Sequence, residues 1–239
     1  VDRLTLYDHD GEYIRMIYPF PNKQLKKVNG LDWKSVPQGG EYPMKNSLLL
    51  QTLLTSGNNS KDSDKHDAMD GNGISTLAVN GNKMAVSKNK LNRLFLDGST
   101  GGLNLEGPST TQFKATNSNI AYGGPIYDVY PSSSAFSPDG KWVYLSGYIH
   151  HIGDTRGRAE INYLHGVVRI PYEEEGKLEV FLGKISPITG QGNNMKDAGN
   201  DDSSFTCATS VACDKSGRIY VSDFMNNRVQ IYSPDKKLL

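Results

Sequence analysis

The chain has 239 residues, and its 26 Lys plus Arg balance 26 Asp plus Glu, so the formal net charge is zero. This length suits one large all-β domain or two small ones, and the balanced charge gives no electrostatic reason to expect a nucleic-acid partner. No apolar run approaches the roughly 20 residues of a membrane-spanning helix. The 25 glycines and 11 prolines indicate a fold rich in turns.

The chain begins with two strand-like segments. The sequence "DRLTLYDHDGEYIRMIYPF", residues 2–20, predicts two strands joined by a tight turn. Residues 21–72 follow, and they are too many for a simple connection, so we predict an insertion there. Within this insertion, Asn46–Gly57 ("NSLLLQTLLTSG") is the best helix candidate in the chain, although it is short and its apolar pattern does not separate helix from strand.

Later segments repeat one pattern, in which two strands flank a tight turn and a longer connection leads to further strands. Such a unit is a four-stranded antiparallel meander, and a single meander cannot bury both of its faces. Several meanders arranged radially can do so, and we therefore predict an all-β fold, a β-propeller built of four-stranded antiparallel blades. The predicted strands are Ile74–Val79, Lys83–Ser87 and Arg93–Leu96, then Ser133–Ser137, Trp142–Gly147, 166–172 and 177–184, then Thr209–Asp214, Arg218–Ser222 and Arg228–Tyr232.

The two ends of the sequence read as the same part of such a unit. Asp2–Tyr7 aligns with Asn227–Tyr232, so both ends supply a third strand. We therefore expect about four blades in this chain, as an excerpt of a larger propeller, with a closed four-bladed ring as the alternative. The expected division is 1–20 as the end of a blade, 21–72 as an insertion, 73–117 as a blade, 118–185 as a blade with a long loop, and 186–239 as the last blade.

The last blade resembles the NHL repeat. The segment "SVACDKSGRIYVSDFMNNRVQIYSPDKKLL" has an apolar strand, the D-x-x-G turn of Asp214 and Gly217, the strand "RIYVSD" and the motif "NRVQIY". Residues 72–98 match loosely through "NRLFLDG", and "AFSPDGKWVYLSG" is similar to the YVTN or WD40-like blade. The resemblance implies a propeller of about six blades or more. It also implies a structural role, packing between blades, for the arginines that each open a third strand, which are Arg3, Arg93 and Arg228.

The two cysteines, Cys207 and Cys213, are not expected to form a disulfide with each other. If the segment between them is extended, six steps of about 3.3 Å separate the two Cα atoms by about 20 Å. A disulfide requires Cα atoms at roughly 4.4–6.8 Å. We therefore predict two free thiols.

A long loop, Tyr148–His165, joins the second and third strands of its blade and carries three of the five histidines. Imidazole and carboxylate groups are ligands for zinc and related metals, so His150, His151 and His165 are candidate metal ligands. The alternative is a polar surface loop whose histidines happen to be close. For a bound partner or ligand, the candidate contact residues are Tyr148, His150, His151, Asp154 and Trp33.

An acidic segment, residues 58–73, is a weaker candidate for a Ca²⁺ site. Oxygen-rich acidic loops bind Ca²⁺, but the spacing of an EF-hand loop is not met, and a solvated loop is the alternative. The cofactor prediction is therefore limited to a divalent metal, Ca²⁺ or Zn²⁺. The acidic residues concerned are Asp62, Asp64, Asp67 and Asp70.

Two functions follow from these observations. The first is a non-catalytic NHL-like propeller segment that acts as a protein- or ligand-binding or assembly module of a larger protein. Its partners are another protein or neighbouring domains of the same polypeptide, with no nucleic acid and no membrane span. The second is a metal-dependent enzyme of the lactonase or lyase type, which the loop histidines favour. No nucleophile-elbow or phosphate-loop motif is present in the sequence.

Two further expectations concern placement. The insertions Pro21–Asn72 and Tyr148–His165 should lie at the same end of the propeller, because blade-to-blade connections and connections between second and third strands leave the blades there. For the compartment we take a bacterial periplasmic or extracellular location as the expectation, although no secretory signal opens this sequence.

Overall fold

The computed structural model describes residues 3–44, 75–87, 90–110, 131–153, 159–185 and 195–239. Within these residues the regular structure consists of β-strands and three short 3-10 turns, with no α-helix. The all-β prediction is therefore confirmed for the described residues. The helix candidate Asn46–Gly57 lies outside them.

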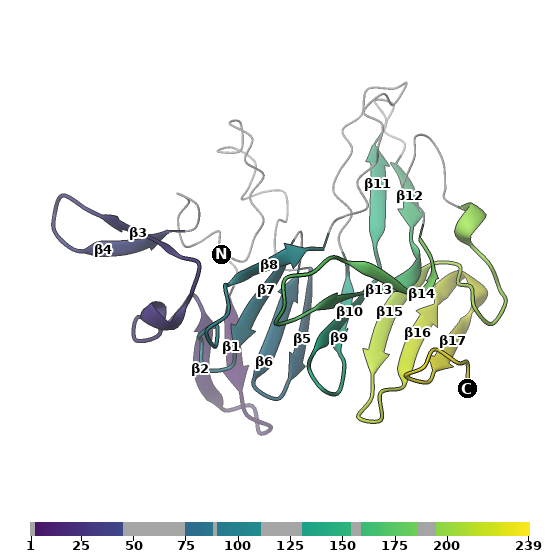
Figure 1. Cartoon of the computed structure of the whole chain (residues 1–239), viewed down its shortest axis with the longest axis horizontal. Helices are drawn as coiled ribbons and strands as arrows, with labels where there is room; N and C mark the ends of the chain where they lie inside the picture. The colour runs from purple at the N-terminus through teal and green to yellow at the C-terminus, as the bar shows by residue number, and fades with distance from the viewer. Residues whose placement is uncertain (1–2, 45–74, 88–89, 111–130, 154–158, 186–194) are drawn as a thin grey trace.

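Four antiparallel sheets stand side by side in a row (Figure 1). Their strands follow one another in sequence order within each sheet, as expected for blades of a propeller. Across the residues that are described, the row is open and does not close into a four-bladed ring. The sheets are β1 (Leu4–Tyr7) and β2 (Tyr13–Tyr18); β5 (Thr76–Asn80), β6 (Lys83–Ser87), β7 (Lys90–Phe95) and β8 (Glu106–Ser109); β9 (Ser133–Phe136), β10 (Trp142–Ser146), β13 (His165–Pro171) and β14 (Glu179–Lys184); and β15 (Ala208–Cys213), β16 (Ile219–Asp223) and β17 (Arg228–Tyr232).

The tight turn between β15 and β16 shows why the D-x-x-G pattern recurs. Oδ1 of Asp214 accepts hydrogen bonds from the backbone N–H groups of Ser216 and Arg218, at 2.9 and 3.0 Å. Gly217 has φ +80°, a left-handed conformation that glycine adopts without strain. The carboxylate and the glycine together fix the turn, so the two strands leave it in register.

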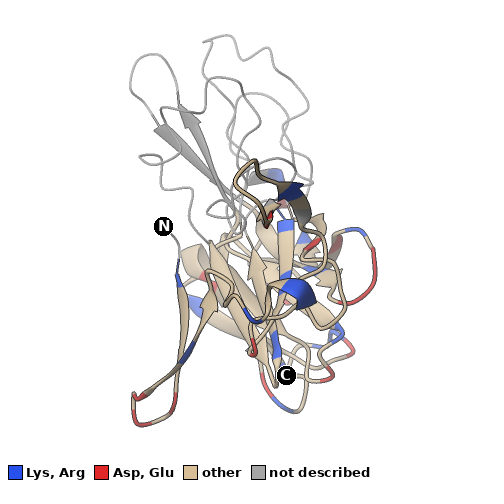
Figure 2. Cartoon of the chain, turned by 90° about the vertical axis from the view of Figure 1, so that its left-hand side faces the viewer, with Lys and Arg blue, Asp and Glu red and all other residues tan. Residues whose placement is uncertain are grey.

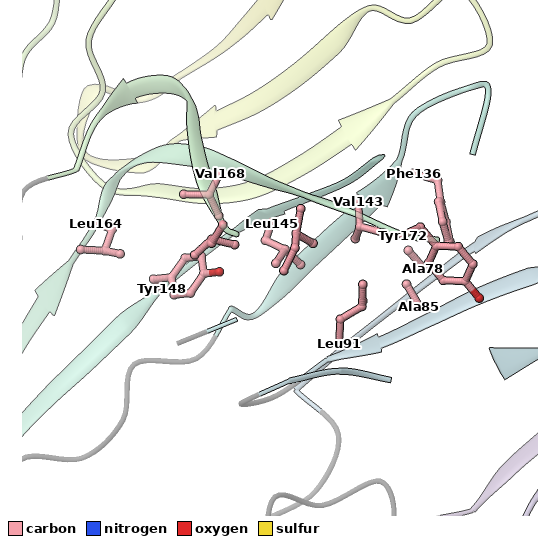
Figure 3. Close-up of a cluster of buried hydrophobic side chains, with 12 residues drawn as sticks. Ala78, Ala85, Leu91, Phe136, Val143, Leu145, Tyr148, Leu164, Val168 and Tyr172 are labelled. Carbon is pink, nitrogen blue, oxygen red and sulfur yellow. The ribbon is translucent and has the colours of Figure 1, made fainter. Parts of the chain in front are cut away.

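The core lies between neighbouring sheets, where alternate residues of each strand are buried. Figure 3 shows the cluster between the sheet of β5 to β8 and the sheet of β9, β10, β13 and β14. Ala78, Ala85 and Leu91 come from the first sheet, and Val143 and Leu145 come from the second. A second cluster joins β1–β2 to the sheet of β5 to β8, and a third joins β13 and β14 to β15, β16 and β17.

The first strands of three consecutive sheets are joined by hydroxyl groups. Oγ1 of Thr76 lies 2.6 Å from Oγ of Ser134, which links β5 to β9. Oγ of Ser133 accepts from the N–H of Val211 at 3.0 Å and donates to its carbonyl oxygen at 3.3 Å, which links β9 to β15. The Ser133 hydroxyl thereby satisfies both backbone groups of Val211 on β15, which is the edge strand of its sheet.

Arg93 links two sheets through its guanidinium group, as predicted, but it does not open its strand. Arg93 is 1% exposed, and its side chain donates to the carbonyl oxygens of Asn104, in the connection between β7 and β8, and of Tyr172 and Glu173, which follow β13 of the next sheet. The strand β7 begins at Lys90, three residues before Arg93. Nη2 of Arg93 also forms an ion pair with Oε1 of Glu175 at 2.9 Å, although that carboxylate is largely exposed.

The register shows that Arg93 and Arg228 occupy different positions. Arg93 pairs with Ala85, the third residue of β6, whereas the third residue of β16, Val221, pairs with Gln230. Arg228 is the first residue of β17 and Arg3 is exposed, one residue before β1. The predicted equivalence of the three arginines is therefore wrong, because pairing across the sheet, rather than the motif, sets where β7 begins.

The two insertions both contribute hairpins, which lie along the same edge of the row of sheets. The first contains the 3-10 turn η1 (Leu25–Lys27) and the strands β3 (Asp32–Ser35) and β4 (Glu41–Met44), and the second contains β11 (Ile149–Gly153) and β12 (Ala159–Tyr163). The β9–β10 and β15–β16 turns lie along the bottom edge of the sheets in Figure 1, and both hairpins lie on the opposite, upper side. The expectation that the insertions share one end is therefore confirmed for these described parts.

We predict that replacing Arg93 with Met lowers the free energy of unfolding by about 3 kcal/mol, because several buried carbonyl oxygens lose a charged donor. Urea unfolding of the purified protein measures this change. The matched control is Arg3→Met, which removes an exposed arginine and should cost less than about 0.5 kcal/mol. Equal losses for the two variants would contradict the assignment of Arg93 as a link between sheets.

Candidate functional site

Tyr148, a candidate contact residue from the sequence, lies in the core. Its side chain is 1% exposed, belongs to the cluster of Figure 3, and donates a hydrogen bond from its hydroxyl to the carbonyl oxygen of Thr110 at 3.1 Å. Burial raises the pKa of this hydroxyl well above its usual value, so it stays protonated. The structure therefore places Tyr148 under the β11–β12 hairpin and not on a binding surface.

The other candidates from the sequence lie on the two insertion hairpins. Trp33 is on β3, where its side chain is 39% exposed. His150 and His151 are neighbouring residues of β11, paired in register with Asn162 and Ile161 of β12. Asp154 and the acidic residues of 58–73 lie outside the described residues. A contact role for Trp33, His150, His151 and Asp154 stays a prediction.

His165, the third candidate metal ligand, is the first residue of β13 and is 1% exposed. Its Nδ1 accepts a hydrogen bond from the backbone N–H of Cys207 at 3.0 Å. This bond places the ring proton on Nε2, which is buried and has no hydrogen-bond partner among the described residues. With Nδ1 accepting this bond and Nε2 protonated, the neutral ring has no free lone pair for a metal ion in this arrangement, and a metal role for His165 stays a prediction.

Within the described residues, one group of metal-ligand side chains comes together, and it is not among those the sequence singled out. Asp8, His9 and Asp10 in the β1–β2 turn have ligand atoms within 4.8 Å of one another, and all three residues are exposed. Figure 2 shows acidic residues at the tip of this hairpin, while basic and acidic residues are interspersed over the rest of the visible face. The adjacency of these residues in "DHDGE" was the available signal.

A groove of about 660 Å³ lies along the first strands of the three larger sheets. Leu77 and Val79 of β5 line it and are 45% and 51% exposed. Several polar groups around it already serve the fold, since Nδ2 of Asn80 donates to the carbonyl oxygen of Ser137 at 2.8 Å and Asp214 holds its own turn. The groove therefore offers both polar and apolar contacts, and part of its polar lining is already used by the fold.

The connection between β16 and β17 presents two large apolar side chains to solvent. It contains the 3-10 turn η5 (Phe224–Asn226), in which Phe224 is 59% and Met225 is 57% exposed. We call Phe224 and Met225 the apolar turn. The sequence analysis did not single out this connection, although two adjacent apolar residues are visible there in "DFMNNR".

The backbone of the apolar turn is held firmly. The N–H of Phe224 donates to the carbonyl oxygen of Cys207 and the N–H of Met225 to that of Thr206, both at 3.0 Å. Immediately before the turn, the fully buried carboxylate of Asp223 accepts from the Thr206 N–H at 2.7 Å and from Nε of Arg228 at 2.8 Å. A buried carboxylate needs such donors, and they fix both ends of the turn.

Both cysteines are free thiols, as predicted. Cys207 precedes β15 and Cys213 ends it, so the strand itself separates them. Burial raises the pKa of the Cys207 thiol to about 11, and the charge of Asp223 acts in the same direction. The thiol is therefore protonated near neutral pH, and reactive thiolate chemistry is disfavoured.

We predict that His165 makes the stability pH-dependent. Burial lowers its pKa in the folded state, and the charges of Asp197 and Asp223 oppose this effect in part. Above the unfolded value of about 6.5 the ring is neutral in both states. As the pH falls below that value, the unfolded chain takes up the proton first, so the free energy of unfolding decreases.

Urea unfolding between pH 5 and pH 8 measures this dependence. The variant His165→Asn does not titrate, and its free energy of unfolding should fall less steeply below pH 6.5 than that of the unchanged protein. Parallel curves for the two proteins would contradict the assignment.

Comparison with known proteins supports the repeat assignment. The family model of the NHL repeat matches residues 205–232. This range covers β15, β16, η5 and β17, the sheet that carries the apolar turn. A search of the curated proteins found no match. Residues 205–232 are therefore similar to an NHL repeat, and the row of antiparallel sheets is consistent with the blades of a propeller.

Proposed function

We propose that the chain is a non-catalytic propeller module that binds another protein, and that the apolar turn of the NHL repeat is part of its binding surface. The observation that carries this proposal is the combination of exposure and fixed backbone at Phe224 and Met225. NHL-repeat propellers often bind proteins, which agrees with the proposal.

Binding a partner is less favourable when the contacting segment must first lose conformational freedom. Scattered exposed apolar residues are ordinary on protein surfaces. Two adjacent ones on a turn whose backbone is already hydrogen-bonded are different, because the turn loses little conformational freedom when a partner covers it. Aromatic residues and Met are also enriched at the centres of interfaces. The apolar turn therefore suits insertion into an apolar pocket of a partner protein.

The other exposed features suit this role less well. The Asp8–His9–Asp10 group is small, polar and fully exposed. The groove along the first strands is lined by side chains that also hold the sheets together, such as Asn80 and Ser134. No described helix is long and apolar enough to cross a membrane.

The test uses a photo-crosslinking amino acid placed at Met225. Crosslinked partner is identified and purified, and its dissociation constant is measured for the unchanged protein and for Phe224→Ser. We expect roughly 30-fold weaker binding, the loss of a central aromatic contact of about 2 kcal/mol. Because Phe224 is exposed, its replacement should change the free energy of unfolding by less than about 0.5 kcal/mol.

The matched control is Tyr13→Ser. Tyr13 is an aromatic residue of similar exposure, 60%, on the β1–β2 hairpin at the other side of the row. Binding should be unchanged in this variant. Equal affinity for Phe224→Ser and the unchanged protein would rule out the apolar turn as the binding surface.

A further inference from the structure

The apolar turn is seated on the two residues that precede β15. As described above, the carbonyl oxygens of Thr206 and Cys207 accept the N–H groups of Met225 and Phe224. The directions of these two carbonyls depend on the backbone angles of Thr206 and Cys207. Whatever fixes those angles therefore also fixes where the Phe224 and Met225 side chains point.

Cys207 has an unusual backbone conformation for this role. Its φ is +66°, in the left-handed region that residues with a Cβ atom rarely adopt. Such a conformation persists when surrounding contacts determine it. Here the peptide N–H of Cys207 is buried and donates to Nδ1 of His165, 42 residues earlier in the chain.

His165 is itself fixed by the neighbouring sheet. It pairs with Lys184 across β13 and β14, and the preceding residue of β14, Gly183, has φ +74° and lies against the His165 carbonyl. A Cβ atom at Gly183 would collide with that carbonyl oxygen and with the ring of Phe205. The imidazole is therefore fixed in position between the sheet that contains β13 and residues 205–232.

Of the two ring nitrogens of His165, Nδ1 is the one that stabilises the neighbouring backbone. Within the part of the chain that the structure describes, Nε2–H is buried and has no partner, and such a group costs free energy that an apolar side chain would not cost. An apolar side chain, however, would leave the Cys207 N–H buried without an acceptor. Asp197 and Asp223 are the nearby carboxylates, but Asp223 is already engaged with Thr206, Asn226 and Arg228.

We propose that His165 is a positioning residue for the apolar turn: its Nδ1 holds Cys207 in the left-handed conformation, and the Thr206 and Cys207 carbonyls then hold Phe224 and Met225. Its role in partner binding rests on the proposed function, whereas the positioning of the turn by His165 does not depend on a partner. Through it, a residue of one sheet sets the binding surface of the next.

The experiment is amide hydrogen exchange of the full chain, measured by mass spectrometry on peptides that contain residues 224–226. In His165→Leu the acceptor is lost, and exchange of the Phe224 and Met225 amides should rise about tenfold, as expected for a loss of roughly 1.4 kcal/mol. In His165→Asn the side-chain oxygen takes the place of Nδ1, and protection should return toward that of the unchanged protein.

The matched control is Val168→Ala in the same strand. Val168 is fully buried in the cluster of Figure 3, and it is not one of the residues that link His165 to the turn through hydrogen bonds. This variant lowers global stability, but it should not raise exchange at residues 224–226 relative to the amides of β16. Should His165→Leu fail to fold, His165→Gln, whose acceptor is displaced by one methylene, takes its place in the comparison.

Three results would overturn the proposal: unchanged exchange at residues 224–226 in His165→Leu, no recovery in His165→Asn, or the same selective increase in Val168→Ala. None of these measurements involves a partner. Their failure is therefore separate from failure of the proposed function, which appears as unchanged partner affinity in Phe224→Ser.

Discussion

Each central sheet of this protein has two apolar faces, and the rest of the structure depends on covering both of them. In the sheet of β5 to β8, Met84, Val86 and Leu94 face β1 and β2, whereas Ala85 and Leu91 face the next sheet. Because neighbouring residues of a strand point to opposite faces, no choice of strand order within one sheet buries both sets. The sheets must therefore stand beside one another, and their connections fall at the two ends.

Polar side chains cross the boundaries that this packing creates. Tyr172 follows β13, and its hydroxyl lies 2.9 Å from the carbonyl oxygen of Leu94 in the preceding sheet, while Arg93 of that sheet donates to the carbonyl oxygen of Tyr172. Ser133 does the same for Val211 at the next boundary. Apolar packing holds the sheets together but does not fix how far one sheet is shifted along the strands of its neighbour. These directional hydrogen bonds fix that position.

The strands could be predicted from the sequence because their signals are local. Alternating residues and the D-x-x-G turn act within a few residues, and every strand of the four sheets except β7 and β8 was expected close to its observed bounds. The β3–β4 and β11–β12 hairpins lie within segments that were read as insertions without strands of their own. The start of β7 was misplaced because it depends on pairing with β6 and β8. The sequence indicates the local elements better than the contacts between them.

The candidate site was harder to predict for the same reason. Tyr148 begins a long loop in the sequence, yet it fills the core because residues from several strands surround it. The bond between His165 and Cys207 joins segments 42 residues apart, and no local pattern reveals it. The apolar turn was readable as two large apolar residues in a polar connection, but its exposure and its backbone bonds are properties of the fold.

The β11–β12 hairpin has a consequence for how the molecule tolerates change. It is inserted between β10 and β13, which are nevertheless hydrogen-bonded neighbours, and it forms a two-stranded sheet of its own. Closing a longer loop costs only about 0.6 kcal/mol for each doubling of its length. The sheet therefore does not require any particular hairpin there. A foreign peptide or small domain whose two ends lie close together can be grafted at this position, which makes the protein a scaffold for display.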